Sequence, residues 1–144
     1  MKTHFSGKRK TISVAESCTG GLLGNIITDA PGSSDYFIGG VIAYHNRVKT
    51  RLLKVPEKIL NKHGAVSAQT AKLMAQNVRK LFNSDLGLAI TGIAGPTGGT
   101  KQKPVGLVYI AISDSRKLIC KKYLFSGPRK KIKSQSAHAA LNLL

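Results

Sequence analysis

Acidic side chains are scarce in this sequence: six Asp and Glu stand against 23 Lys and Arg in 144 residues, a net charge of +17. Such a charge creates a long-range positive field that attracts nucleic acid, nucleotides and phosphorylated substrates. The basic residues are densest at 7–10, at 47–62 and over the last third, and no recognised nucleic-acid-binding motif organises them. Nucleic acid therefore remains an open but not a favoured partner, and a solvated basic surface is the other interpretation.

Cysteine is also rare, because the sequence contains only Cys18 and Cys120. The two lie far apart and match no metal-binding or redox spacing, so we expect reduced thiols. Histidine forms no HxH, HxxxH or HExxH pattern, which makes a metal hydrolase an unfavoured interpretation. The histidines are His4, His45, His63 and His138.

Long apolar runs are absent, since no stretch approaches the roughly 18–20 apolar residues that span a bilayer. The basic start of the chain lacks the apolar segment and small-residue cleavage site of a secretory signal. We therefore expect a soluble, cytoplasmic protein that has no membrane partner.

Strand and helix patterns alternate along the chain. The clearest helix is expected over 67–83, where apolar residues recur at helical spacing and Ser67 is suited to cap the first turn. The other expected elements are strands at 11–17, 36–44 and 85–91, a helix at 19–30, two short helical pieces broken at Pro56, a β-hairpin of 105–113 and 117–125, and a final helix from Pro128. This order predicts an α/β fold, with residues 1–144 forming a single three-layer α/β/α domain around a mixed sheet.

Three loops compete for the ligand site, because ligands of such sheets bind where the loops gather at the carboxyl ends of strands. The first is "ESCTGG" at 16–21, in which Glu16 could orient the loop or act as a base, and Cys18 could be a nucleophile or a structural thiol. The glycine-rich "TGIAGPTGG" at 91–99 offers backbone amides to a phosphate or an oxyanion, or is simply a flexible connection. It lacks the ending of a P-loop, so ATP hydrolysis is not indicated.

The third loop is the "GSS" turn at 32–34, where a serine could either close the bend or act as a nucleophile. Serine needs a base, and a lysine whose pKa is lowered by burial can serve as one. Ser34, Tyr44 and Lys49 could therefore form a Ser-Lys site, although most Ser and Lys pairs at this separation are unrelated.

Several segments together resemble the CinA C-terminal domain family, also called PncC, the nicotinamide-nucleotide amidases. They are "AESCTGGLLGNIITDAPGSSDYFIGGVIAYHNRVKTRLL", "HGAVS", "DLGLAITGIAGPTGG", "KPVGLVYIAI" and "FSGPR". The resemblance implies hydrolysis of nicotinamide mononucleotide to nicotinate mononucleotide and ammonia by a Ser-Lys mechanism that needs no metal or cofactor. It also implies a homo-oligomer.

The resemblance carries site roles onto particular residues. Ser34 becomes the nucleophile, Lys49 its base, Tyr44 the linking hydroxyl and Arg129 a group for the phosphate or a carboxamide oxygen. The residues expected to bind substrate are Arg129, Thr91, Gly92, Ala94, Gly95, Thr19 and Gly20. The loop that supplies the oxyanion donors stays open, with "TGIAG" preferred.

The sequence also departs from the family pattern. About ten residues precede the first expected strand where members usually carry an additional helix, and Pro128 replaces the usual acidic residue before Arg129. The chain is also more basic than the family. A catalytically reduced, nucleic-acid-binding accessory protein is therefore the alternative function.

Overall fold

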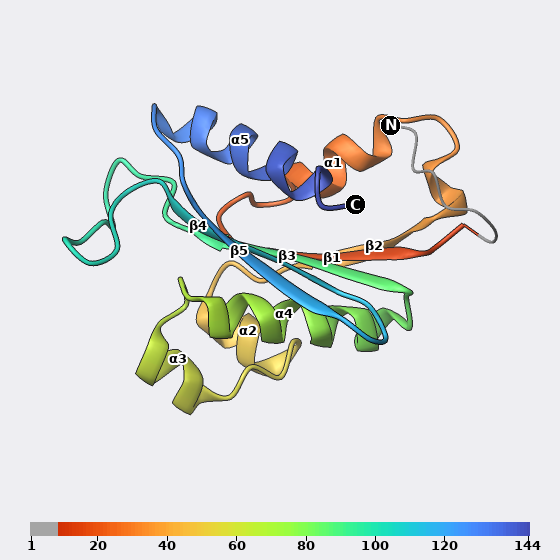
Figure 1. The fold of residues 1–144 in the computed structure, drawn as a ribbon, viewed down its shortest axis with the longest axis horizontal. Helices are drawn as coiled ribbons and strands as arrows, with labels where there is room; N and C mark the ends of the chain where they lie inside the picture. Colours follow the sequence, from red (N-terminus) through yellow and green to blue (C-terminus); the bar gives the residue numbers. More distant parts are fainter. Residues whose placement is uncertain (1–8) are drawn as a thin grey trace.

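The computed structural model describes residues 9–144, and a five-stranded mixed sheet runs through its centre (Figure 1). The strands are β1 (Ile12–Glu16), β2 (Phe37–Ile42), β3 (Leu86–Gly92), β4 (Leu107–Ser113) and β5 (Leu118–Leu124). They lie in the order β2-β1-β3-β4-β5. β1 pairs in parallel with β2 and β3, whereas β3, β4 and β5 pair antiparallel, so the predicted hairpin and mixed sheet are confirmed.

Helices cover both faces of this sheet, which confirms the predicted three layers. They are α1 (Leu22–Thr28), the 3-10 turn η1 (Ser33–Asp35), α2 (Asn46–Arg51), α3 (Glu57–His63), α4 (Ala68–Phe82) and α5 (Arg129–Leu141). In Figure 1, α1 and α5 lie on one face, and α2, α3 and α4 lie on the other.

The core consists of two apolar clusters, one on each face of the sheet. Leu23 and Ile132 bring α1 and α5 onto Leu88 and Ile110 of the central strands. On the other face, α4 packs through the predicted apolar stripe, including Met74 and Val78. Burying these side chains stabilises the layers by about 1.5–3 kcal/mol for each large residue.

The helix predicted over 19–30 is shorter in the structure, because residues 17–21 form a turn that leads out of β1. Gly20 and Gly21 have φ values of 60° and 106°, in the left-handed region where glycine is favoured. The Glu16 carboxylate then accepts hydrogen bonds from the N–H groups of Leu23 and Gly24, at 2.8 and 3.0 Å. This acid therefore caps α1 from the end of the strand.

The strand order reverses at β1, which lies between β2 and β3. β2 pairs with one side of β1, and β3 pairs with the other side, both in parallel. The loops that follow these three parallel strands therefore gather at one edge of the sheet, where ligands of α/β proteins bind.

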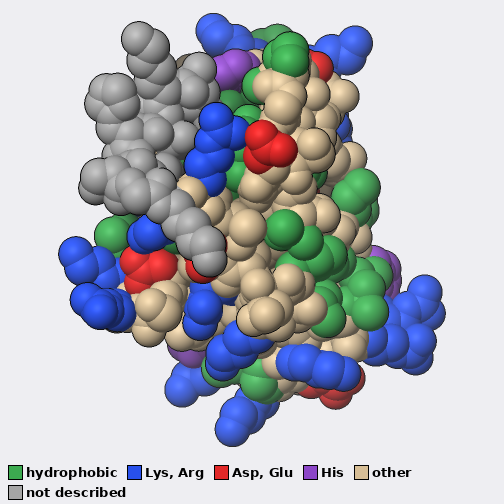
Figure 2. All heavy atoms as spheres, turned by 90° about the vertical axis from the view of Figure 1, so that its right-hand side faces the viewer, with side chains coloured by type: hydrophobic (Ala, Val, Ile, Leu, Met, Phe, Trp, Pro, Cys, Tyr) green, Lys and Arg blue, Asp and Glu red, His purple; other side chains and the backbone are tan. Residues whose placement is uncertain are grey.

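Basic side chains are distributed over the surface, as the face in Figure 2 shows, with few acidic ones between them. Among the described residues, no helix is both long and apolar enough to cross a membrane. His4, residues 7 and 8 of the basic group at 7–10 and most of the segment before the first strand lie outside the described residues.

Candidate active site

A cavity of about 330 Å³ lies at the carboxyl ends of β1 and β3. Its walls come from the turn after β1, the start of α2, the 64–66 connection, the glycine-rich loop after β3 and the start of α5. The lining residues are Ser17, Cys18, Tyr44, Asn46, Lys49, Ala65, Val66, Thr91, Gly92, Ile93, Ala94, Gly95, Thr97, Gly98 and Arg129.

Lys49 of α2 lines the cavity and is almost completely buried, with only 1% of the residue exposed. Its Nζ donates hydrogen bonds to Ser17 Oγ at 3.0 Å, to the Ala43 carbonyl at 2.7 Å and to the Tyr44 carbonyl at 3.1 Å. Burial lowers the pKa of Lys49 from 10.5 to about 8, against a smaller opposing effect of Cys18. A fraction of the lysine is therefore neutral near pH 7, and the neutral amine can accept a proton.

Ser17 is the hydroxyl that this lysine contacts. It directly follows β1, and its N–H donates to the Ile90 carbonyl of β3 at 3.0 Å, so the sheet fixes its backbone. When Lys49 is neutral, its two N–H groups can remain on the carbonyls of Ala43 and Tyr44. Its lone pair then faces the Ser17 hydroxyl, which is the arrangement of a general base and its nucleophile.

The two other groups of the "ESCTGG" loop do not have this arrangement. Glu16 is buried and directed at the α1 N–H groups, so of the two roles considered for it the structure supports orientation of the loop. Burial raises the pKa of Cys18 to about 11, which leaves a protonated thiol at neutral pH. A protonated thiol is a poor nucleophile, so Cys18 lines the cavity and is not a candidate nucleophile.

Arg129, the first residue of α5, joins three segments at the rim of the cavity. Its Nη1 donates to the Gly95 carbonyl at 2.6 Å, and its Nη2 donates to the Tyr44 hydroxyl at 3.1 Å. The predicted grouping of Tyr44, Lys49 and Arg129 is therefore present in one site. Tyr44 reaches it by two routes, since its carbonyl accepts from Lys49 and its hydroxyl accepts from Arg129.

The predicted substrate-binding residues after β3 also line the cavity. Thr91 is buried, and its hydroxyl donates to the Ala65 carbonyl at 2.7 Å, which ties the end of β3 to the 64–66 connection. Gly92, Ala94 and Gly95 follow it along the wall. The loop after β3 is thus placed where its backbone can face a bound substrate.

Ser34 is not brought to Lys49, and this placement corrects the sequence-based prediction. Ser34 lies in η1, before the amino end of β2, whereas Lys49 follows the carboxyl end of the same strand. A six-residue strand is about 20 Å long, so the two residues lie at opposite edges of the sheet. Ser34 is exposed there and does not line the cavity, and Ser17 occupies the position beside the lysine.

Thr19 and Gly20 are a second departure from the prediction, because neither lines the cavity. They lie just beyond its wall in the turn between Ser17 and α1. Thr19 is 1% exposed, and its hydroxyl has no hydrogen-bond partner among the described residues.

Sequence reasoning missed Ser17, Asn46, Ala65 and Val66 as cavity residues. The sequence contained an indication for Ser17. This serine lies at the carboxyl end of one expected strand, and the Tyr44–Lys49 segment begins at the carboxyl end of the next one. Carboxyl ends of neighbouring parallel strands meet at one edge, whereas a residue that precedes a strand lies at the other edge.

A second cavity, of about 380 Å³, lies between α2 and α3 and includes Arg47, Arg51 and Glu57 in its wall. It holds no buried base beside a nucleophile, so it is not the candidate active site. Among residues 9–144, no group of three or more His, Cys, Asp or Glu side chains is placed to hold a metal ion.

Comparisons with known proteins agree with this architecture. The model of the family described as "CinA C-terminal domain" matches residues 1–144. A "CinA-like protein" of Syntrophus aciditrophicus is 54% identical over 138 residues, which are 95% of this chain and 33% of that protein. A "CinA-like protein" of Koribacter versatilis is 53% identical over 134 residues, or 93% of this chain and 32% of that protein. The chain thus spans about a third of these relatives.

Solved structures show the same fold. The competence/damage inducible protein CihA of Agrobacterium tumefaciens has a TM-score of 0.91 at 36% identity, covering 93% of this chain and 82% of that one. A competence-damaged protein (CinA) superfamily protein of Escherichia coli has a TM-score of 0.89 at 28% identity, covering 94% and 81%.

Proposed function

Because the chain belongs to the CinA C-terminal domain family, we propose that it is an amidohydrolase that converts nicotinamide mononucleotide to nicotinate mononucleotide and ammonia. The observation that carries this proposal is the 3.0 Å contact between Lys49 Nζ and Ser17 Oγ inside a cavity. A buried lysine of lowered pKa beside a serine is one of the arrangements that can activate a serine for amide hydrolysis through an acyl-enzyme.

In the first half of the reaction, neutral Lys49 takes the proton of Ser17 while Oγ attacks the carboxamide carbon. The tetrahedral intermediate carries its negative charge on the former carbonyl oxygen. As the intermediate collapses, the C–N bond breaks, and Lys49 returns its proton to the departing nitrogen, which leaves as ammonia. The pyridine carbonyl remains as an ester on Ser17.

Water completes the reaction by the same steps. Lys49 takes a proton from water, the hydroxide attacks the ester carbon, and Ser17 leaves with the proton that the lysine returns. The oxyanion donors that we propose are the N–H of Cys18, which follows the nucleophile, and the N–H groups of Ala94 and Gly95. Arg129 holds Tyr44 and Gly95 in position at the rim of the cavity.

The two serines provide a matched test. Ammonia release from nicotinamide mononucleotide is measured for the wild-type protein, Ser17→Ala and Ser34→Ala. We expect Ser17→Ala to lose about 10³-fold or more in kcat, because the nucleophile is removed. Ser34→Ala should stay within about threefold of the wild type, because Ser34 is exposed at the opposite edge of the sheet.

The reverse result would return the role of nucleophile to Ser34. Full activity in both variants would remove the Ser-Lys mechanism. A wild-type protein that binds DNA with a steep salt dependence and releases no ammonia would favour the alternative function, a nucleic-acid-binding accessory protein.

A further inference from the structure

Lys133 lies over the turn that carries the proposed nucleophile. It is one helical turn after Arg129 in α5, so both side chains extend from the same side of that helix. A methyl group added at Gly20 would lie 3.8 Å from Lys133 Nζ, which places the ammonium directly against the turn. Lys133 is half-buried there, whereas its neighbours Lys130 and Lys131 are exposed.

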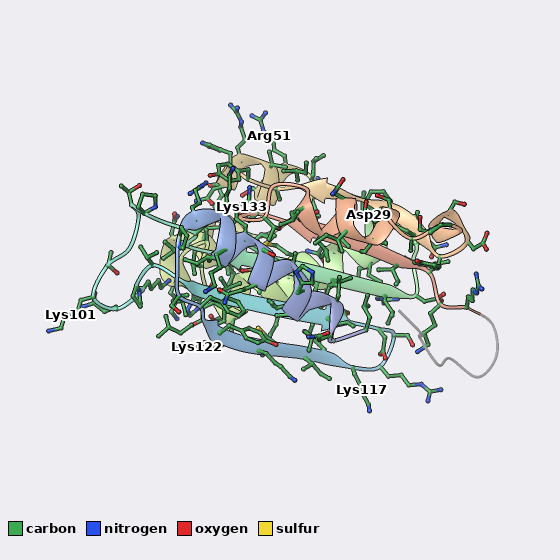
Figure 3. All side chains as sticks on the ribbon, turned by 90° about the horizontal axis from the view of Figure 1, so that it is seen from above. Asp29, Arg51, Lys101, Lys117, Lys122 and Lys133 are labelled. Carbon is green, nitrogen blue, oxygen red and sulfur yellow. The ribbon has the colours of Figure 1, made fainter. Side chains whose placement is uncertain are left out.

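The side chain of Lys133 has no protein partner among residues 9–144. Its ammonium forms no ion pair and donates no hydrogen bond to another residue in that part of the chain. The nearby acid Glu16 is committed to the N–H groups at the start of α1. Figure 3 shows Lys133 on the first turns of α5, at the end of the molecule from which the loop with Lys101 projects, and Asp29 farther along the molecule.

Arg129, the other cation of this region, is already engaged. Both terminal nitrogens of its guanidinium donate to the protein, to the Gly95 carbonyl and the Tyr44 hydroxyl. A phosphate that bound Arg129 would compete with the contacts that hold the cavity wall. Lys133 is therefore the better placed cation for a substrate anion beside Ser17.

A second observation in the same turn points to a ligand. The Thr19 hydroxyl is buried and has no hydrogen-bond partner among the described residues. An unpaired buried hydroxyl is costly, and proteins usually satisfy such a group with a bound water, ion or ligand. Thr19 adjoins Gly20, whose missing side chain leaves room next to the Lys133 ammonium.

We propose that Lys133, together with Thr19 and Gly20, binds the phosphate of the mononucleotide and so selects nucleotides over their dephosphorylated nucleosides. This inference rests on the proposed function, because it assigns the anionic end of that substrate. The reacting amide would lie against Ser17 and Lys49, and the phosphate would lie across the turn beneath α5.

The experiment compares Lys133→Gln with the matched control Lys130→Gln, which removes the same charge from an exposed position of the same helix. For each protein, kcat/KM is measured with nicotinamide mononucleotide and with nicotinamide riboside, which lacks the phosphate. We expect the mononucleotide-to-riboside ratio to fall about 10- to 100-fold in Lys133→Gln, the loss of one charge-assisted hydrogen bond. The ratio should stay at the wild-type value in Lys130→Gln and recover substantially in Lys133→Arg.

An equal loss on both substrates, or an equal loss in both lysine variants, would overturn the assignment. Calorimetric binding of nicotinate mononucleotide supplies a readout that does not depend on turnover. If the wild-type protein has no amidase activity, the proposed reaction fails, and the binding measurement still tests the subsite. Weaker binding in Lys133→Gln and in Thr19→Val than in Lys130→Gln would support the subsite, and equal binding in all of them would refute it.

Discussion

At the scale of single residues, the site depends on one lysine that the fold withdraws from water. Its nitrogen keeps three polar neighbours, two of which are backbone carbonyls that can only accept. These carbonyls hold the neutral amine as well as the ammonium, so the geometry of Lys49 is retained when it loses its proton. Burial sets the pKa, and the carbonyls set the direction of the lone pair toward Ser17.

The lowered pKa of Lys49 predicts a rising pH profile. The base must be neutral, and a group with a pKa of about 8 is only about 10% neutral at pH 7. The kcat/KM for ammonia release should therefore increase about tenfold per pH unit below pH 7 and level off above about pH 8.5.

A pH–rate series between pH 5.5 and 9.5 measures this rise, and Cys18, with a pKa of about 11, does not change its charge within that range. A flat profile, or a rate that falls from pH 6 to 8, would contradict lysine as the base.

Part of this arrangement was predicted from the sequence. The resemblance implied that Tyr44, Lys49 and Arg129 share one site, and the structure brings these three residues together. The pairing of Ser34 with Lys49 was wrong in its placement, because the strand between the two residues puts them at its opposite ends. Ser17 was not considered as the partner of the lysine. The three-dimensional partner of Lys49 follows a different strand, 32 positions earlier in the chain.

At the scale of helices and strands, close contact between backbones matters more than propensity. Gly87 of β3 lies directly under α4, and a Cβ there would collide with the Ala75 carbonyl oxygen and approach Arg79. Gly24 in α1 has room for a side chain, because an added Cβ would make ordinary 3.6 Å contacts with Glu16 and Phe37.

These two glycines predict opposite effects of one substitution. Gly87→Ala should lower the free energy of unfolding by about 1–3 kcal/mol, since neither backbone can move away cheaply. Gly24→Ala should raise it by about 0.5–1 kcal/mol, because alanine stiffens a helix that has room for it.

Urea unfolding of both variants, followed by circular dichroism, checks the pair. Destabilisation by Gly24→Ala, or no effect of Gly87→Ala, would show that the helix–sheet spacing differs from this description.

Elements with a regular pattern were predicted well, and turns were not. α4 was expected at 67–83 and spans Ala68–Phe82, because its apolar stripe and Ser67 cap are local signals. α1 was expected from residue 19 and begins at Leu22, because its start depends on a carboxylate that reaches it from the preceding strand. A contact of that kind is tertiary and has no periodic signature.

At the scale of the whole molecule, 23 basic residues stand against six acids, so the acids cannot balance most of the positive charge. Repulsion between like charges destabilises a compact state, and dissolved salt screens it. We therefore expect the melting temperature to rise on the order of 5 °C between about 20 mM and 500 mM NaCl.

Differential scanning fluorimetry at a series of salt concentrations measures this effect. Sodium sulfate at matched ionic strength is the control, because simple screening gives the same rise with both salts at low concentration. A melting temperature that falls with salt, or that responds to sulfate alone, would rule out general screening as the cause.

The proposed reacting pair and the two cations of α5 come from different layers of the molecule. Ser17 and Lys49 are held by β1 and by α2 on the α4 side, whereas Arg129 and Lys133 belong to α5 on the other side. Under the proposed function, substitutions in α5 beyond Arg129, which holds Tyr44 and Gly95 in the site, would alter recognition and leave Ser17 and Lys49 in place. The proposal then implies that a change of substrate would arise most easily in that one helix.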